Sequence, residues 1–386
     1  MHVQAQYCSP FRLPLATRRR AGEGIPVSQE RGHTDKETKR NEFARNRNRI
    51  SLEEEPAMKA WLIERRNDEA HIGMSDVPSP RMGPGDLLVR VRAIGVNRAD
   101  LARRTGHYER LPASTDLPIP GLEMAGEVVA LGQGVRGFHV GDRVMGLPAQ
   151  AYAEQVVLQA AHALPVPAGL QWIEAAALPM AFLTAHNAMV TEGKVRRGDH
   201  VLVQGAATGV GMAAMQIARL QGAASIAGSA SGGKLPKLAE YGLDHGFDYR
   251  TGDGVAQVLR ASGGHGADVI IDMVGASAAA STLAAAAERA RWIQVGRMGG
   301  GQATIDLDTM ARKRLALIGV TFRTRSSDEI AALVSAARAD LEEALASRRI
   351  SLPVAKVFAF DEADEAQAFM RSGSYLGKIV LEGAKG

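Results

Sequence analysis

A glycine-rich turn between an apolar strand and a helix is the clearest chemical feature of the sequence. The apolar run Val201-Leu202-Val203 leads into residues 205–211, which read Gly-Ala-Ala-Thr-Gly-Val-Gly. Such a turn points backbone N–H groups at a pyrophosphate, and the dipole of the following helix favours the negative charge. Ala206 and Thr208 stand where the pattern G-x-G-x-x-G has its first two glycines. The order of strand, turn and helix still predicts a dinucleotide site.

The next predicted strand indicates the type of dinucleotide. It ends at Gly228 and Ser229, where NAD-preferring sites usually place an acidic residue that binds the ribose 2′-OH. No acid stands there, and Lys234 follows. Because a 2′-phosphate would meet no carboxylate and would be neutralised by the lysine, NADP(H) is favoured over NAD(H). The alternative for Lys234 is an ordinary position at the start of a helix.

The cysteine and histidine residues give no sign of a zinc site. The single cysteine is Cys8, which excludes a disulfide framework and a cysteine-rich zinc module. The histidines at 107, 139, 162 and 186 lack the spacing of metal ligands. We therefore expect no metal site.

Alternating strands and helices must position the glycine-rich turn. Repeated βαβ units with apolar strands predict a doubly wound parallel sheet. Ahead of it, from Met58 to about residue 178, short β-like segments punctuated by Gly and Pro predict a barrel-like β domain. A helix pair around Pro179 separates the two patterns, and two helices and a last strand follow residue 328. The expected strands are 201–203, 225–227, 269–272, 292–295 and 315–318, and the expected helices are 212–220, 234–241 and 276–290.

Composition limits the class of protein. The chain has 386 residues, whereas single cores stop growing near about 250–300 residues, so two domains are expected. Hydrophobic residues make up 46% and charged residues 23%, close to a soluble globular average. No window approaches the roughly 18 apolar residues of a membrane-spanning helix. We expect a cytoplasmic protein without a membrane partner.

Most of the positive charge lies near the N-terminus. Residues 1–57 hold 11 Lys/Arg and 8 Asp/Glu, which gives +3 of the formal net charge of +4. Their polar composition predicts a disordered extension. Because Met58 opens an amphipathic strand, the extension is also expected to be extraneous to the folded part. A transit peptide for an organelle is an alternative, because residues 1–22 carry four Arg and no acid. A nucleic-acid-binding arm is disfavoured by the mixed charge and scarce aromatics.

Dispersed motifs give the chain a family resemblance. They are residues 95–101 (Gly-Val-Asn-Arg-Ala-Asp-Leu), 106–108 (Gly-His-Tyr), 120–128, the turn at 205–211, 296–301 and the ending 377–381. In this order they resemble the medium-chain dehydrogenase/reductase superfamily. Within it they resemble the zinc-free quinone oxidoreductases of the zeta-crystallin branch, closest to the p53-inducible quinone oxidoreductase type. The resemblance covers about residues 58–381.

The resemblance implies an α/β fold in which a Rossmann doubly wound parallel sheet is inserted in a GroES-like β-barrel domain. The GroES-like substrate domain would comprise residues 58–182 and 323–386, and the Rossmann NADP(H)-binding domain residues 183–322. The active site would lie in the cleft between them, and the protein would form a homodimer. Zinc-dependent members bind their catalytic metal through Cys, His and Cys. The matching positions here are Asn97, Leu122 and Met180, none of which is a normal zinc ligand.

The implied reaction is NADPH-dependent reduction of a quinone or conjugated enone by direct hydride transfer, without metal or flavin. The resemblance places Asn97 and Tyr108 near the nicotinamide. Their amide and phenol would donate hydrogen bonds to the oxygen that gains charge, so they are the candidate catalytic residues. The candidate cofactor-binding residues are Thr184, Ala206, Thr208, Gly209, Val210, Gly211, Ser229, Lys234, Tyr249, Gly296, Met298, Gly299, Phe322 and Lys378.

Two alternatives remain open. One is a 2-enoyl-thioester reductase, which would use the same hydride chemistry on an enoyl-CoA. The other is an NADPH-binding sensor or adaptor, or a nucleic-acid-binding protein, with little catalysis. A small-molecule quinone or enone is the expected partner, and nucleic acid is not expected.

Overall fold

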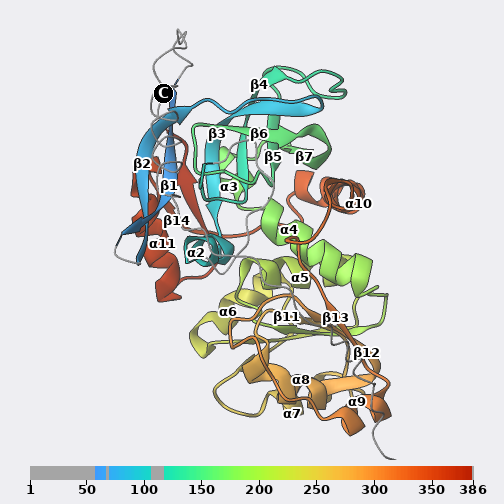
Figure 1. Ribbon diagram of the computed structural model, residues 1–386. Coiled ribbons are helices and arrows are strands. Elements are labelled where there is room, and N and C mark those ends of the chain that lie inside the picture. Colours follow the sequence, from blue (N-terminus) through green and yellow to red (C-terminus); the bar gives the residue numbers. More distant parts are fainter. Residues whose placement is uncertain (1–56, 67–68, 106–116, 385–386) are drawn as a thin grey trace, which may run out of the picture. The chain divides into compact units, whose positions relative to one another are not determined.

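Two sheets and a hairpin organise the chain in the computed structural model (Figure 1). The structure describes residues 57–66, 69–105 and 117–384. The extension predicted for residues 1–57 lies outside these ranges except for Ala57, and so does the candidate catalytic residue Tyr108.

A six-stranded sheet carries the glycine-rich turn, and all of its described pairings are parallel. Its order is β10-β9-β8-β11-β12-β13, the order 3-2-1-4-5-6 of a Rossmann sheet. Figure 1 shows α5 and α6 on one face of the sheet and α7 and α8 on the other. The predicted doubly wound parallel sheet is therefore confirmed. Its strands are β8 (His200–Gln204), β9 (Ser225–Ala230), β10 (His245–Asp248), β11 (Ala267–Asp272), β12 (Ala286–Gln294) and β13 (Ala316–Gly319), and its helices are α5 (Gly209–Leu220), α6 (Leu235–Leu238), α7 (Gly254–Ala261), α8 (Ala279–Ala285) and α9 (Leu307–Lys313), with short turns η4 (Gly232–Lys234), η5 (Ala239–Tyr241) and η6 (Ala276–Ala278).

A seven-stranded sheet and the β1–β2 hairpin form the other part. The sheet order is β14-β15-β3-β4-β5-β7, and β6 also pairs with β3. The last strand, β15, pairs antiparallel with β3, opposing Ile379 to Val96. The strand β15 thus rejoins the sheet that contains β3, and the Rossmann sheet is inserted between these two strands in the chain. The strands are β1 (Ala57–Arg66), β2 (Glu69–Pro78), β3 (Asp86–Val96), β4 (Met124–Leu131), β5 (Arg143–Gly146), β6 (Gln155–Gln159), β7 (Ala163–Pro165), β14 (Val354–Phe358) and β15 (Lys378–Glu382).

The remaining helices flank these sheets. They are α2 (Arg98–Arg104), α3 (Trp172–Ala176), α4 (Pro179–His186), the π-helical turn η3 (Asn187–Glu192), α10 (Ser327–Ala346) and α11 (Ala363–Ser372), with short turns η2 (Ala160–His162) and η7 (Phe360–Glu362). Helix α4 packs against α5 of the Rossmann part and also against α10. The strand β14 was not predicted from the sequence. The domain boundaries at 182/183 and 322/323 remain predictions.

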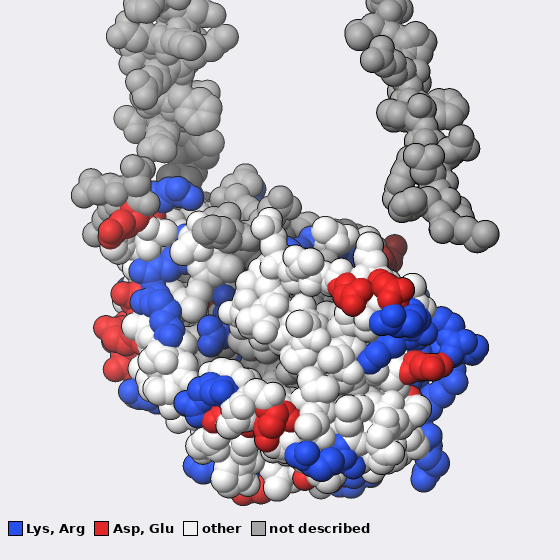
Figure 2. All heavy atoms as spheres, turned by 90° about the horizontal axis from the view of Figure 1, so that it is seen from below, with Lys and Arg blue, Asp and Glu red and all other residues white. Residues whose placement is uncertain are grey.

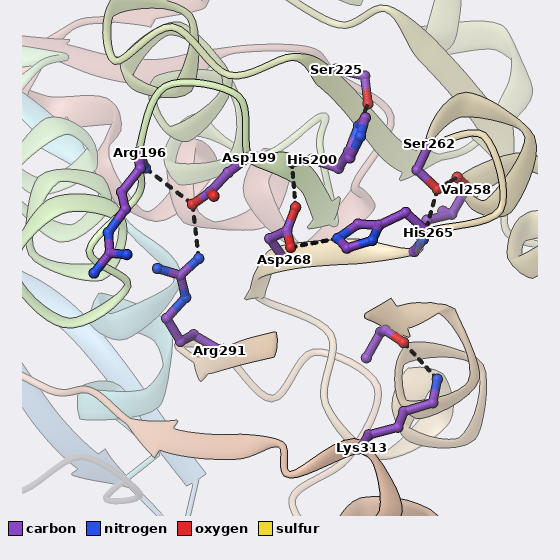
Figure 3. A network of polar contacts seen from close by, with 12 residues as sticks. Arg196, Asp199, His200, Ser225, Val258, Ser262, His265, Asp268, Arg291 and Lys313 are labelled. Carbon is purple, nitrogen blue, oxygen red and sulfur yellow. Dashed lines mark hydrogen bonds and ion pairs between the residues drawn. The ribbon is translucent and has the colours of Figure 1, made fainter. Parts of the chain in front are cut away.

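A polar network ties together the starts of three parallel strands (Figure 3). The backbone N–H of His200 in β8 donates to Asp268 of β11 over 2.8 Å, and the imidazole of His200 bonds to Ser225 of β9. Asp268 also bonds to His265 over 2.8 Å. This network lies at the N-terminal ends of the strands. The glycine-rich turn follows the C-terminal end of β8, on the opposite side of the sheet, where ligands of such sheets bind.

The alanine-rich run is shorter as a helix than the sequence predicts. The predicted helix 276–290 ends at Ala285, and Ala286–Gln294 forms β12 between β11 and β13. Alanine has the highest helix propensity, but pairing in a buried sheet overrides it. The side chain of Lys313 donates to the carbonyls of Leu283 and Ala284 and to that of Ala286, and thereby closes the helix end.

Gly211 allows the first turn of α5 to pack closely against the glycine-rich turn. A Cβ at this position would lie 2.5 Å from the Gly205 carbonyl oxygen and 2.8 Å from that of Ala206. Gly211→Ala should therefore lower the free energy of unfolding by about 1–3 kcal/mol. Gly301→Ala is the control, because a Cβ there meets open space. Urea unfolding should separate the two variants, and equal midpoints would contradict the packing constraint.

Candidate active site

The glycine-rich turn has the geometry of an anion site. Thr208 is the N-cap of α5: its hydroxyl accepts from the Gly211 N–H over 3.0 Å and donates to the Gly205 carbonyl over 2.9 Å. Gly205 has a φ of +82°, which favours glycine. A Cβ on Gly209 would lie 3.1 Å from the stem of Lys378. The N-terminus of α5 therefore offers backbone N–H groups and space for the pyrophosphate of a dinucleotide.

A cleft of about 1200 Å³ lies beside this turn and is lined by residues of both sheets. Ala206 and Gly211 are buried beneath the turn and do not line the cleft. Tyr108 lies outside the described residues. The structure brings the other candidates together around the cleft: Asn97, Thr184, Thr208, Gly209, Val210, Ser229, Lys234, Tyr249, Gly296, Met298, Gly299, Phe322 and Lys378.

A buried carboxylate organises one end of the cleft. Glu123 has an exposed fraction of 0%. It accepts from the side-chain amide of Asn97 and from the backbone N–H of Met180, both over 2.8 Å. Lys378 forms an ion pair with it and donates to Asn97 Oδ1 over 2.9 Å. Glu123 was not among the candidate catalytic or cofactor-binding residues predicted from the sequence, although it lies in the motif 120–128.

A second buried carboxylate supports this end from behind. Asp100 Oδ2 accepts from the Asn97 N–H over 2.8 Å and from the Tyr152 hydroxyl over 3.2 Å. Within the described part of the chain, Asp100 Oδ1 has no hydrogen-bond partner. Burial raises the pKa of Asp100 from 3.8 to about 7, because ionisation would cost hydration.

The other end of the cleft carries the residues expected at the adenosine. The Ser229 hydroxyl donates to Gln204 over 2.6 Å and accepts from the Gly205 N–H, so it holds the turn in place. Lys234 donates to the Gly373 carbonyl over 2.8 Å, and burial followed by repulsion from Arg98 lowers its pKa. The side chain of Tyr249 lies at the rim and is 65% exposed, as a residue that stacks on a ligand would be.

An acid that sequence reasoning missed also lines the end of the cleft where the adenosine is expected. Asp248, the last residue of β10, accepts from the Gly232 N–H over 2.9 Å and forms an ion pair with Arg250. Hydrogen bonds from Arg250 hold the pKa of Asp248 well below its usual range. The carboxylate is therefore ionised and matched by a guanidinium.

A third acid shapes the wall of the cleft. Asp272, at the end of β11, has an exposed fraction of 0%. It accepts from the N–H groups of Val274 and Gly275 over 2.7 and 2.8 Å, and from the Trp292 indole. Burial raises its pKa. These bonds fix the loop after β11, of which Met273 and Val274 line the cleft.

On the face drawn in Figure 2, positive and negative side chains of the described residues are mixed. An uncharged, hollowed centre is flanked there by Lys and Arg, several of which lie beside Asp or Glu. In the described ranges no helix combines the length and apolar character needed to cross a membrane. The same residues contain no group of three or more His, Cys, Asp or Glu placed to hold a metal ion.

Comparison with known proteins decides the family. Residues 83–168 match the family "Alcohol dehydrogenase GroES-like domain", and residues 209–338 match the family "Zinc-binding dehydrogenase". The quinone oxidoreductase of Rattus norvegicus is 31% identical over 313 residues, 80% of this chain and 92% of that protein. The chain belongs to the medium-chain dehydrogenase/reductase superfamily. Within this superfamily it falls in the quinone oxidoreductase-like branch, as its motifs predicted.

Further relatives support this membership. The synaptic vesicle membrane protein VAT-1 homolog of Mus musculus is 42% identical over 200 residues, 51% of this chain and 48% of that protein. The chain thus spans about half the length of this curated relative. A solved structure of a mycobacterial quinone oxidoreductase is 27% identical with a TM-score of 0.74, covering 85% of this chain and 100% of that one. The predicted GroES-like and Rossmann combination is the fold of these medium-chain relatives.

The raised pKa of Asp100 predicts a pH-dependent effect of Asp100→Asn. As the pH rises from about 4 to about 7, the carboxyl ionises in the unfolded chain while the folded protein keeps its proton, so the wild type loses stability. Asparagine does not titrate. The free energy of unfolding of the variant, relative to wild type, should therefore rise by about 3 kcal/mol from pH 5 to pH 8. Urea titrations at both pH values measure it, and a pH-independent difference would contradict it.

Proposed function

We propose that this chain reduces quinones or conjugated enones with NADPH by direct hydride transfer, using neither metal nor flavin. The observation that carries the proposal is the cleft itself. It joins the N-terminus of α5, at Thr208 and Gly209, to the polar end formed by Asn97 and Lys378. A dinucleotide extended from one to the other would place its nicotinamide beside an acceptor at the polar end.

The residues at the polar end support chemistry without zinc. Asn97, Leu122 and Met180 stand where zinc-dependent members have Cys, His and Cys, and none provides a thiolate or imidazole. In addition, the Asn97 side-chain amide and the Met180 backbone N–H already donate hydrogen bonds to Glu123. This donor set does not fit a catalytic zinc ion.

The reaction would divide between the cofactor and the chain. NADPH, when bound, supplies a hydride from C4 of its nicotinamide. Thr208 and the turn would hold the pyrophosphate, and Thr184 and Phe322 would pack at the nicotinamide end. Tyr108 and the polar cluster that includes Asn97 would act at the acceptor oxygen, which gains negative charge. The acceptor gains a hydride and one proton from solvent, and a quinone leaves as a hydroquinone.

NADPH is favoured over NADH at the adenosine end. Lys234 lines the cleft and β9 ends without an acid, as the sequence indicated. Asp248 would repel a 2′-phosphate if it were unpaired, but Arg250 neutralises it. The local balance of charge thus favours a dianionic phosphate ester.

Assembly and location follow the resemblance. We expect a homodimer, and β13 is the edge of the six-stranded sheet, with Leu317 41% exposed. An unpaired edge strand can pair with a second copy. A cytoplasmic location and a small-molecule partner remain part of the proposal.

Lys234→Ala should weaken NADPH far more than NADH. A charge-assisted contact with the 2′-phosphate is worth about 1.5–3 kcal/mol, so the dissociation constant for NADPH should rise roughly 10–100-fold. Lys237→Ala is the control, because Lys237 is exposed on α6 and does not line the cleft. Fluorescence titration with both cofactors tests this, and equal losses for NADPH and NADH would refute the assignment.

An acceptor panel tests the reaction itself. The full-length protein should oxidise NADPH with 1,2- or 1,4-naphthoquinone, and Tyr108→Phe should lower kcat while cofactor affinity stays intact. Turnover of crotonyl-CoA in place of quinones would favour the enoyl-thioester alternative. No oxidation above background with any acceptor would leave the sensor or adaptor class.

A further inference from the structure

The hydrogen bonds of Asn97 leave it no free donor. A side-chain amide carries two N–H hydrogens. Those of Asn97 go to Glu123 Oε1 over 2.8 Å and to the Gly95 carbonyl over 3.2 Å. Its Oδ1 accepts from Lys378 over 2.9 Å. An acceptor oxygen in the cleft would therefore have to break one of these bonds to reach the Asn97 amide.

Lys378 has the donor that Asn97 lacks. An ammonium group carries three N–H hydrogens, and two of them are directed to Asn97 Oδ1 and Glu123 Oε1. The side chain is 7% exposed, and the residue lines the cleft. Its stem lies against Gly209 at the start of α5. Among the described residues the third hydrogen has no acceptor, and the position of the cation is fixed by the two acceptors.

The ammonium lies close to positions that the resemblance matches to the zinc ligands of zinc-dependent members. It bonds to Asn97 and to Glu123, which follows Leu122 in the chain, and Glu123 in turn holds the N–H of Met180. By the resemblance, Asn97, Leu122 and Met180 match the Cys, His and Cys of the zinc-dependent members. A positive charge is therefore present at this point without a metal ligand set.

We propose that Lys378 is the residue that donates a hydrogen bond to the acceptor carbonyl oxygen, with Asn97 and Glu123 as its positioning residues. The proposal rests on the proposed function, because it needs a carbonyl acceptor at the polar end. It limits the acceptor to compounds that bring an oxygen to the ammonium as charge builds on it. No proton transfer is required, since the ammonium stabilises the oxyanion and solvent protonates the product.

The competing role for Lys378 is a ligand of the cofactor phosphates. Its stem at Gly209 passes close to the expected pyrophosphate, so the two roles must be separated by measurement. A phosphate ligand acts on cofactor affinity, whereas a carbonyl donor acts on turnover. The dissociation constant for NADPH and kcat therefore report on different roles.

The test compares Lys378→Met with the double variant Glu123→Gln/Lys378→Met. Removing only the lysine leaves Glu123 buried without its counter-charge, which is strongly destabilising; the double variant removes both charges and keeps the test valid. Lys356→Met is the control, because Lys356 lies in the neighbouring strand β14 and does not line the cleft. We expect kcat with naphthoquinone to fall about 100–1000-fold in the double variant, with the dissociation constant for NADPH nearly unchanged.

A second readout does not depend on turnover. 4-Nitrophenol bound beside NADP⁺ should ionise at lower pH in wild type than in the double variant, as followed by phenolate absorbance. An ionisation that is the same in both proteins, or a weakened NADPH affinity with unchanged kcat, would overturn the role of Lys378. A wild type that stabilises the phenolate but reduces no acceptor would instead overturn the proposed reaction and leave the donor role standing.

Discussion

The buried carboxylate of Glu123 is the constraint on which the site depends. An ionised group without water is costly unless it is paired and hydrogen-bonded. Its partners come from three separate elements: Asn97 before α2, the Met180 N–H at the start of α4, and Lys378 at the start of β15. The polar end of the cleft is therefore complete only when the last strand of the chain has returned to β3.

The two ends of the cleft divide the work of the site. In the proposed function, Thr208 and the N-terminus of α5 hold a dinucleotide whose adenosine half lies near Lys234 and the Asp248–Arg250 pair. The seven-stranded sheet contributes the cluster around Glu123. Each part alone would lack half of what the proposed hydride transfer needs, which is a held cofactor and a polar partner for the acceptor oxygen.

Elements that are determined by residues close together in the chain could be predicted from the sequence. The apolar strands and the capped turn at Thr208 predicted the parallel sheet and its dinucleotide site. The end of the alanine-rich helix was missed because Lys313, which closes it, lies 27–30 residues further along the chain. Glu123 was missed as an organiser because its cation, Lys378, is 255 residues away. Asp248 was missed because only the sheet order places β10 beside β9 at the cleft.

Direct hydride transfer within the cleft is the central claim, and isotope transfer tests it most directly. The full-length protein would reduce a conjugated enone with NADPH that carries deuterium at one or the other C4 position, in ordinary water. The account predicts one deuterium on the β-carbon of the product from one labelled form and none from the other. Product free of deuterium from both forms would contradict it.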